Sequence, residues 1–93
     1  MKVSLLVTVI NAKKTLPVTL RSIGEQDYPD LEVVVVDGGS TDGTVELIKL
    51  FAAQMEGRRG FLVKCVSEPD KGLYDAMNKA FRMSAGDVIA VCN

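Results

Sequence analysis

A run of acidic, hydroxyl and glycine residues at positions 37–44, Asp-Gly-Gly-Ser-Thr-Asp-Gly-Thr, carries the clearest chemical signal in the chain. Asp37 ends an apolar run, where a carboxylate can accept hydrogen bonds from a nucleobase imide N–H or a ribose hydroxyl. The glycines allow a tight turn and the close approach of a ligand. The alternative is a strand-to-helix turn whose polar side chains only satisfy the backbone, with Asp42 or Thr41 capping the next helix.

A second polar group lies between residues 67 and 80. Lys71 precedes an expected helix N-terminus, and a cation beside the partial positive charge of that terminus suits a diphosphate. Asp75 and Asn78 are three residues apart and therefore share one side of this helix. The alternative is that Asp75 is simply a favourable carboxylate in the first turn, and that Lys71 is a solvated loop lysine.

Several common phosphate-binding and acid–base motifs do not occur. The loop at residues 11–14 has no glycine and the chain has no GxxxxGK[ST] pattern, so hydride transfer and ATP hydrolysis lack support. The chain has no histidine, which leaves acid–base chemistry to carboxylates. Glu68 stands where a receiver domain would need an aspartate, which argues against that class.

Apolar runs and helical stripes alternate along the chain. The Val-rich runs predict strands over residues 2–10, 32–37, 61–68 and 87–93. Helices are predicted over residues 15–25, over 44–56 and from 73 to a stop at Gly86, the last with an apolar stripe of Leu73, Ala76, Met77, Ala80 and Phe81. The order β-α-β-α-β-α-β predicts a Rossmann-like three-layer α/β/α fold with a mainly parallel sheet, whose ligands bind at the carboxyl ends of the strands.

Length and composition restrict the class of protein. A chain of 93 residues forms one domain or part of one, and its net charge of -1 provides no positive field for nucleic acid. Cys65 and Cys92 lack metal-binding spacing and are expected to be core thiols in a reducing compartment, the cytoplasm. The longest apolar stretch, residues 3–10, is far shorter than the ~20 residues of a membrane span.

Three segments resemble a known family: VSLLVTVINA at residues 3–12, VVVVDGGSTDGT at 33–44 and SEPDKGLYDAMNKAFRMSAGDVI at 67–89. They are similar to the N-terminal, nucleotide-binding half of family 2 glycosyltransferases of the GT-A fold, especially bacterial polysaccharide enzymes of the colanic-acid type. The resemblance covers essentially all 93 residues, and the last two segments are far more specific than a single glycine motif. It implies one unit, residues 1–93, that binds a nucleotide-diphospho-sugar.

The resemblance also implies roles for five residues. Thr8 and Asn11 line the nucleotide pocket, and Asp37 binds the base or ribose, usually of a UDP-sugar. Lys71 contacts the base or diphosphate side of the pocket, and Asp75 helps to hold the nucleotide or sugar. The acceptor in such enzymes is a growing polysaccharide or a lipid-linked saccharide, so the expected location extends to the inner face of the cytoplasmic membrane.

Two departures from the family pattern limit what this chain is expected to do. Ile10 stands where the family commonly has an aromatic residue, and the missing ring is expected to weaken packing against a base or to change the preferred nucleotide. The Asp-x-Asp-like ligands for Mn²⁺ or Mg²⁺, the catalytic carboxylate and the acceptor-binding half follow the fourth strand in the family and are not among these residues. We therefore expect the chain as given to bind a nucleotide weakly, to transfer no sugar and to self-associate through an uncovered sheet edge.

Two other classes of protein stay open at this point. A nucleotidyltransferase or methyltransferase with another α/β nucleotide fold would also place an acidic residue after the second strand, although the missing glycine turn argues against the methyltransferase. A non-catalytic nucleotide-binding or interaction module would need no further domain. Thermal shifts with UDP, GDP and S-adenosylmethionine would separate the enzyme classes.

Overall fold

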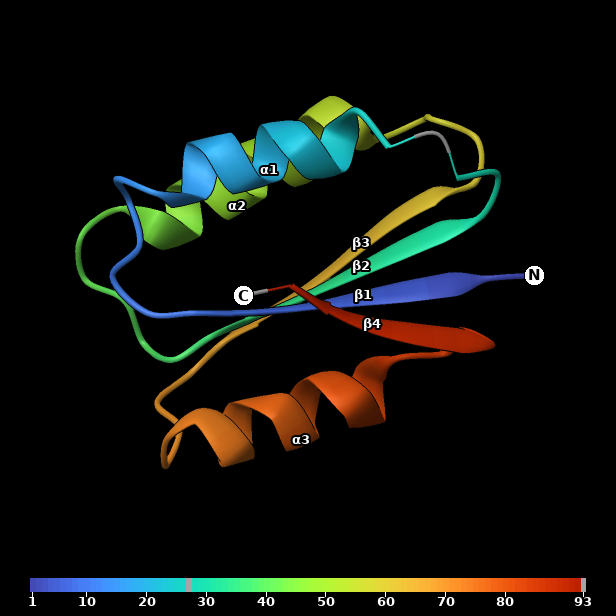
Figure 1. Cartoon of the computed structure of the whole chain (residues 1–93). Coiled ribbons are helices and arrows are strands. Elements are labelled where there is room, and N and C mark those ends of the chain that lie inside the picture. Colours follow the sequence, from blue (N-terminus) through green and yellow to red (C-terminus); the bar gives the residue numbers. More distant parts are fainter. Residues whose placement is uncertain (27, 93) are drawn as a thin grey trace.

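The computed structural model describes residues 1–26 and 28–92, in which strands and helices alternate (Figure 1). The predicted order of elements is confirmed, and every described boundary lies within three residues of its prediction. Asn93, the last residue of the fourth predicted strand, lies outside the described residues. The elements are β1 (Val3–Val9), α1 (Leu16–Gly24), β2 (Leu31–Asp37), α2 (Thr44–Met55), β3 (Phe61–Ser67), α3 (Leu73–Met83) and β4 (Val88–Cys92).

The four strands form one parallel sheet in the order β3-β2-β1-β4. Helices α1 and α2 cover one face and α3 covers the other, which gives the predicted three-layer fold (Figure 1). Right-handed crossovers explain this division, because the chain moves in one direction from β1 to β3 and then returns across the sheet to β4. The strand order therefore reverses between β1 and β4, which is where such sheets form a ligand-binding crevice.

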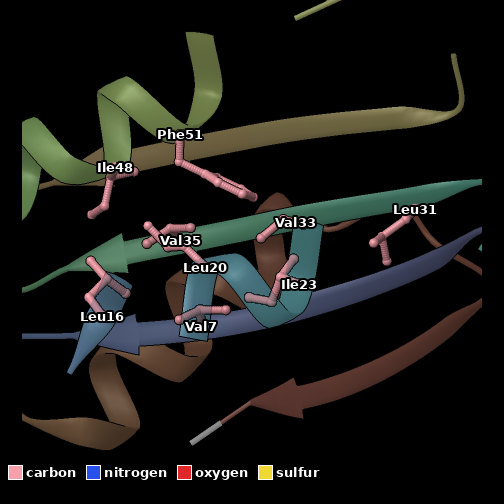
Figure 2. Packing of buried hydrophobic residues seen from close by; sticks show 9 residues of the cluster. All are labelled: Val7, Leu16, Leu20, Ile23, Leu31, Val33, Val35, Ile48 and Phe51. Atoms are coloured by element: carbon pink, nitrogen blue, oxygen red, sulfur yellow. The ribbon is translucent and has the colours of Figure 1, made fainter. Parts of the chain in front are cut away.

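Strand β2 is the centre of the core, since all seven of its residues are buried. Its odd-numbered valines, Val33 and Val35, face α1 and α2, and pack with Leu20, Ile48 and Phe51 (Figure 2). The even-numbered valines of β2 face α3 and pack with Leu6, Ala76 and Ala80. A strand covered on both faces needs apolar side chains on both, which explains the run of four valines.

The apolar stripe predicted for α3 is only partly correct. Ala76 and Ala80 are buried as predicted and Met77 is half-buried, whereas Leu73 is 63% exposed and Phe81 is 60% exposed. The helix contacts the sheet through its two small alanines, so the larger side chains at the margins of the stripe stay outside the contact. The prediction that Gly86 ends this helix is also wrong, because α3 ends at Met83.

Gly86 has a different role, which is to let the chain pass close to the sheet. A Cβ atom at this position would contact the hydroxyl oxygen of Ser4 and would lie 2.7 Å from the Ser4 backbone nitrogen. The Gly86 N–H donates to that hydroxyl over 2.8 Å. Glycine is therefore needed for packing at a point where the chain turns from α3 into β4.

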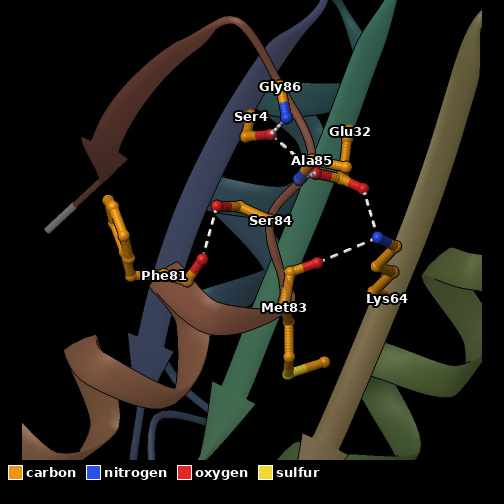
Figure 3. A network of polar contacts seen from close by, with 8 residues as sticks. All are labelled: Ser4, Glu32, Lys64, Phe81, Met83, Ser84, Ala85 and Gly86. Atoms are coloured by element: carbon orange, nitrogen blue, oxygen red, sulfur yellow. Dashed lines mark hydrogen bonds and ion pairs between the residues drawn. The ribbon is translucent and has the colours of Figure 1, made fainter.

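A buried polar network fastens this turn to the sheet (Figure 3). Glu32 has no exposed surface, and its Oε2 accepts hydrogen bonds from the Ser4 hydroxyl at 2.6 Å and the Ala85 N–H at 2.8 Å. The ammonium nitrogen of Lys64 lies 2.6 Å from Oε1 of Glu32 and donates to the Met83 carbonyl. Burial by itself would raise the pKa of Glu32, but these partners lower it to about 2.

The edges of the sheet are less covered than its centre. Cys65, predicted to be a core thiol, is exposed because it lies on edge strand β3, and Cys92 on β4 is half-buried. On β4 the side chains of Val88, Ile89 and Val91 are exposed. These residues alternate between the two sheet faces, so β4 is uncovered on both. Within residues 1–26 and 28–92, no helix has the length and apolar character needed to cross a membrane.

Candidate nucleotide-binding site

The carboxyl ends of β1 and β2 carry two loops that are hydrogen-bonded to each other. The Asn11 N–H donates to the Ser40 hydroxyl oxygen at 2.7 Å, and the Thr41 N–H donates to Oδ1 of Asn11 at 2.9 Å. Asn11 adopts a positive φ of 45°, a conformation that asparagine tolerates better than most residues. These bonds hold the Asn11 side chain, which is exposed, at the rim of the sheet.

Asp37 is the buried anchor beneath the second loop. Its side chain has no exposed surface, and Oδ2 accepts hydrogen bonds from the N–H groups of Gly39 (3.1 Å) and Ser40 (2.8 Å) and from the hydroxyl of Ser67 (2.8 Å). The hydroxyl of Ser40 donates to Oδ1. Burial alone would raise the pKa of Asp37, but the hydrogen bonds from Ser40, Ser67 and Gly39 lower it below its ordinary value.

This inward orientation changes how Asp37 can take part in binding. The sequence predicts a carboxylate that reaches the ligand directly, whereas the structure directs it to its own loop and to β3. A ligand can reach Oδ1 only after the Ser40 hydroxyl, its one donor among the described residues, turns away. In the geometry described, Asp37 positions Ser40 and the loop that contacts Asn11.

Asp42 has a structural role in the turn, but the predicted capping by Asp42 or Thr41 is wrong, because Gly43 is the N-cap residue of α2 and no side chain caps the helix there. Oδ1 of Asp42 accepts the N–H of Thr44 at 3.1 Å, at the start of α2, and its Oδ2 accepts the N–H of Lys13 at 3.2 Å. The Thr44 hydroxyl also accepts the N–H of Ala12 at 3.0 Å. The hydrogen bonds that Asp42 accepts lower its pKa, and the bond from the Thr44 hydroxyl has the largest effect. The loop after β1 is therefore fixed to the start of α2.

Lys71 and Asp75 lie together at the start of α3. The N–H of Lys71 donates to Oδ2 of Asp75 at 2.9 Å, which lowers the pKa of that carboxyl. The Lys71 side chain is exposed and available to an anion. Lys79, one turn later, pairs with Asp75 at 3.6 Å and with Glu68 at 3.1 Å. Asp75 therefore orders the loop before α3, in addition to the ligand role predicted for it.

A surface pocket of about 380 Å³ lies between the end of β1 and the start of α3. Thr8 lines it from β1, on the sheet face that α3 covers. Its remaining walls are Val9, Ile10, Asp70, Gly72, Leu73 and Ala76. The pocket is at the carboxyl edge beside the point where strand order reverses, and its volume is within the range of small-molecule sites.

The five predicted site residues all lie at this edge, but they fall into three groups. Ser40 links Asn11 to Asp37, Lys71 contacts Asp75, and Thr8 shares a pocket with Asp70. Sequence reasoning missed the roles of Ser40, Ser67 and Asp70. The one signal for Ser67 was its place at the end of the third predicted strand, because parallel strands end side by side. The register of the sheet indeed pairs Ser67 with Asp37.

The described residues do not form a metal site. No group of three or more His, Cys, Asp or Glu side chains within residues 1–26 and 28–92 is arranged to hold a metal ion. The carboxylates at the rim are engaged with backbone donors, as Asp37, Asp42 and Asp75 show. These described carboxylates therefore do not fit a divalent cation.

Comparison with known proteins decides the family. The model of Glycosyl transferase family 2 matches residues 4–93. The chain belongs to this family. A glycosyltransferase of PGL/p-HBAD biosynthesis from Mycobacterium bovis is 37% identical over 83 residues, covering 89% of this chain and 31% of that protein. Glycosyltransferase AglE of Haloferax volcanii is 31% identical and covers 95% of this chain and 28% of that protein.

Solved structures of glycosyltransferases share the fold. The mannosyltransferase PcManGT from Pyrobaculum calidifontis, in complex with GDP-Man and Mn²⁺, is 34% identical with a TM-score of 0.83 over 95% of this chain and 26% of that chain. The S. aureus TarS structure with UDP-GlcNAc is 28% identical with a TM-score of 0.78, and the match covers 98% of this chain and 26% of the TarS chain. The fold is the N-terminal part of the GT-A fold, as predicted. The chain spans about a third or less of the length of these relatives.

Proposed function

We propose that residues 1–93 form the nucleotide-binding half of a glycosyltransferase, which holds a nucleotide-diphospho-sugar, a UDP-sugar, for transfer to a growing polysaccharide or lipid-linked acceptor. The observation that supports this most directly is the junction at the carboxyl edge, where Ser40 links the exposed Asn11 to the buried carboxylate of Asp37. It lies where parallel α/β sheets bind ligands. The structures of TarS with UDP-GlcNAc and of PcManGT with GDP-Man, which share the fold, support a nucleotide-sugar donor.

Each predicted residue has a proposed part in donor binding. Thr8 lines the pocket floor, and Asn11 presents its side-chain amide at the rim. Asp37 binds the base or ribose through Oδ1 once Ser40 turns toward the ligand. Lys71 faces the diphosphate with its exposed ammonium group, and Asp75 holds the Lys71 backbone in place beside the nucleotide or sugar.

The chemistry of transfer needs groups beyond these. We propose that the complete enzyme uses Mn²⁺ or Mg²⁺, with ligands outside this chain, as the Mn²⁺ in the mannosyltransferase complex suggests. When bound, such a cation stabilises the charge of the departing nucleoside diphosphate. The part proposed for residues 1–93 is to bind and orient the donor, so the chain by itself is expected to bind nucleotide without transferring sugar.

The experiment that tests the donor site is Asp37→Ala in the complete enzyme, with UDP-sugar affinity measured by calorimetry. We expect an affinity loss of at least about tenfold, because the substitution removes the organiser of the loop and a charged acceptor. Asp30→Ala is the control, since Asp30 is exposed and precedes β2 at the opposite edge of the sheet. Unchanged affinity in Asp37→Ala would remove the main support for the site.

We propose the cytoplasm, including the inner face of the cytoplasmic membrane, as the location, because Cys65 and Cys92 are free thiols, which fits a reducing compartment. We also propose that strand β4 mediates self-association of the isolated chain. Its exposed Val88, Ile89 and Val91 and its unpaired edge carry no charge that would oppose pairing. A monodisperse monomer by light scattering would contradict the second proposal.

A further inference from the structure

Asp70 is a carboxylate of the β1–α3 pocket that the donor site described above does not use. It is half-exposed and lines the pocket with Thr8 and Ile10. Its Oδ1 accepts the Gly72 N–H at 3.1 Å, and no other residue of the described part of the chain donates to it. Asp37 differs in both respects, because it has no exposed surface and both of its oxygens are occupied.

The carboxylate of Asp70 lies next to Gly38, in the loop after β2. A Cβ atom built on Gly38 would lie 2.9 Å from Oδ2 of Asp70, which places this oxygen directly over the glycine backbone. The N–H of Gly38 is bonded to the Val9 carbonyl at 2.9 Å, so the backbone beneath Asp70 is fixed to the end of β1. Oδ2 therefore has a defined position beside both loops of the site.

The walls of the pocket suit a flat ring beside this carboxylate. Ile10 is 62% exposed and Leu73 is 63% exposed, and these two apolar side chains come from the two sides of the pocket, the residue after β1 and the start of α3. An apolar ring can bury their surface. An ionised carboxylate repels a diphosphate and attracts N–H and O–H donors, and in a nucleoside these are the base imide and the ribose hydroxyls.

We propose that Asp70 is a second carboxylate that contacts the nucleoside directly and accepts hydrogen bonds from its O–H or N–H donors, beside the contact proposed for Asp37. The inference rests on the proposed donor-binding function and assigns it a further specificity-determining residue. It explains why Gly38 carries no side chain, since any larger residue would displace Oδ2 of Asp70. The exposed ammonium of Lys71, the next residue, is left to the diphosphate.

The test is UDP binding by calorimetry to the full-length protein and to two variants. Asp70→Asn removes the charge, and Gly38→Ala keeps the charge but displaces the carboxylate. Both are expected to weaken UDP binding by about tenfold or more, with melting temperatures close to that of the unaltered protein. Gly38 has no positive φ, so alanine is compatible with its backbone. Asp30→Asn is the control and is expected to bind UDP normally.

Repeating the titrations with 2′,3′-dideoxyuridine diphosphate identifies the donor. If the effect of Asp70→Asn disappears with this ligand, the ribose hydroxyls are the contact, and if it persists, the base N–H is the contact. Both results support the proposal. UDP affinity of Asp70→Asn and Gly38→Ala within about twofold of the unaltered protein overturns it. Failure of the unaltered protein to bind either UDP or GDP overturns the donor-binding function instead.

Discussion

Ser67 donates its hydroxyl to Oδ2 of Asp37 over 2.8 Å, so the last residues of β3 and β2 are joined through their side chains. The bond helps to keep the pKa of the buried carboxyl low. We expect Ser67→Ala to raise the pKa of Asp37 and to lower the free energy of unfolding by about 1 kcal/mol. NMR titration of the carboxyl carbon and urea unfolding would measure the two effects.

Ser84→Ala is the matched control for Ser67. Its hydroxyl donates to the Phe81 carbonyl at the end of α3, where the backbone is exposed. This substitution is expected to leave the pKa of Asp37 unchanged. An equal pKa change in both variants would show that the Ser67 hydroxyl does not act on Asp37.

The stability of the fold at low pH depends on Glu32, which lies near the start of β2, at the end of the sheet away from the candidate site (Figure 3). The folded pKa of this carboxyl, about 2, is below its ordinary value of 4.5, so its contribution to stability is complete above the ordinary value. The contribution is lost as the pH falls from about 4.5 through 2, and amounts to about 3 kcal/mol. Unfolding free energies between pH 6 and pH 2, sampled at about six points, would measure it. Glu32→Gln should show a shallower decline, and parallel curves for the two proteins would contradict the assignment.

Removing the Lys64 ammonium group leaves the buried charge of Glu32 uncompensated. Lys64→Met keeps most of the side-chain stem but takes away the ammonium group 2.6 Å from Glu32. We expect a loss of about 3 kcal/mol at neutral pH, measured by urea unfolding. Lys49→Met on the exposed side of α2 is the control and should change stability by less than about 0.5 kcal/mol.

Arg58 fastens the end of α1 to the turn before β3. Its guanidinium donates to the carbonyls of Gly24 at 2.6 Å and Gln26 at 2.7 Å, and lies 4.8 Å from the ring centroid of Phe61. Arg58→Ala should lower the free energy of unfolding by about 1–2 kcal/mol, because both bonds and the cation–π contact are lost. The neighbouring Arg59 is also exposed, but its side chain makes none of the hydrogen bonds found among the described residues, so Arg59→Ala should have little effect when both variants are compared by thermal unfolding. A similar melting temperature for the two variants would contradict this role.

Gly86 and Gly24 allow a comparison of two glycine-to-alanine substitutions. Gly86→Ala forces a methyl group against the Ser4 hydroxyl and backbone and should destabilise the fold by about 2 kcal/mol or more. Gly24 ends α1, and a Cβ there would make ordinary contacts, at 3.4 Å with the flexible Met55 side chain and at 3.6 Å with the Phe51 ring. Gly24→Ala should therefore be neutral or stabilising by up to about 1 kcal/mol. Equal destabilisation in both variants would show that close packing at Gly86 is not the cause.

Local patterns in the sequence were enough to predict the fold. The Val-rich runs and the helical stripes reflect burial on both faces of β2 and on one face of each helix, and such periodicity depends only on neighbouring residues. The rule that parallel sheets bind ligands at the carboxyl ends of their strands then indicated the segments that carry Asp37, Lys71 and Asp75, and the resemblance to the family added Thr8 and Asn11. The motif spacing was sufficient to indicate the family that the comparison confirmed.

Which of these side chains meet was decided only by the tertiary structure. The burial of Asp37 depends on Ser67, 30 residues away, and the pairing of Glu32 with Lys64 depends on the register of β2 against β3. The position of the Asp70 carboxylate depends on Gly38, because a Cβ there would lie 2.9 Å from Oδ2 of Asp70. Hydrogen bonds and ion pairs between distant segments have no periodic trace in the sequence, because their partners come within a few ångströms only after the strands align and α3 crosses the sheet.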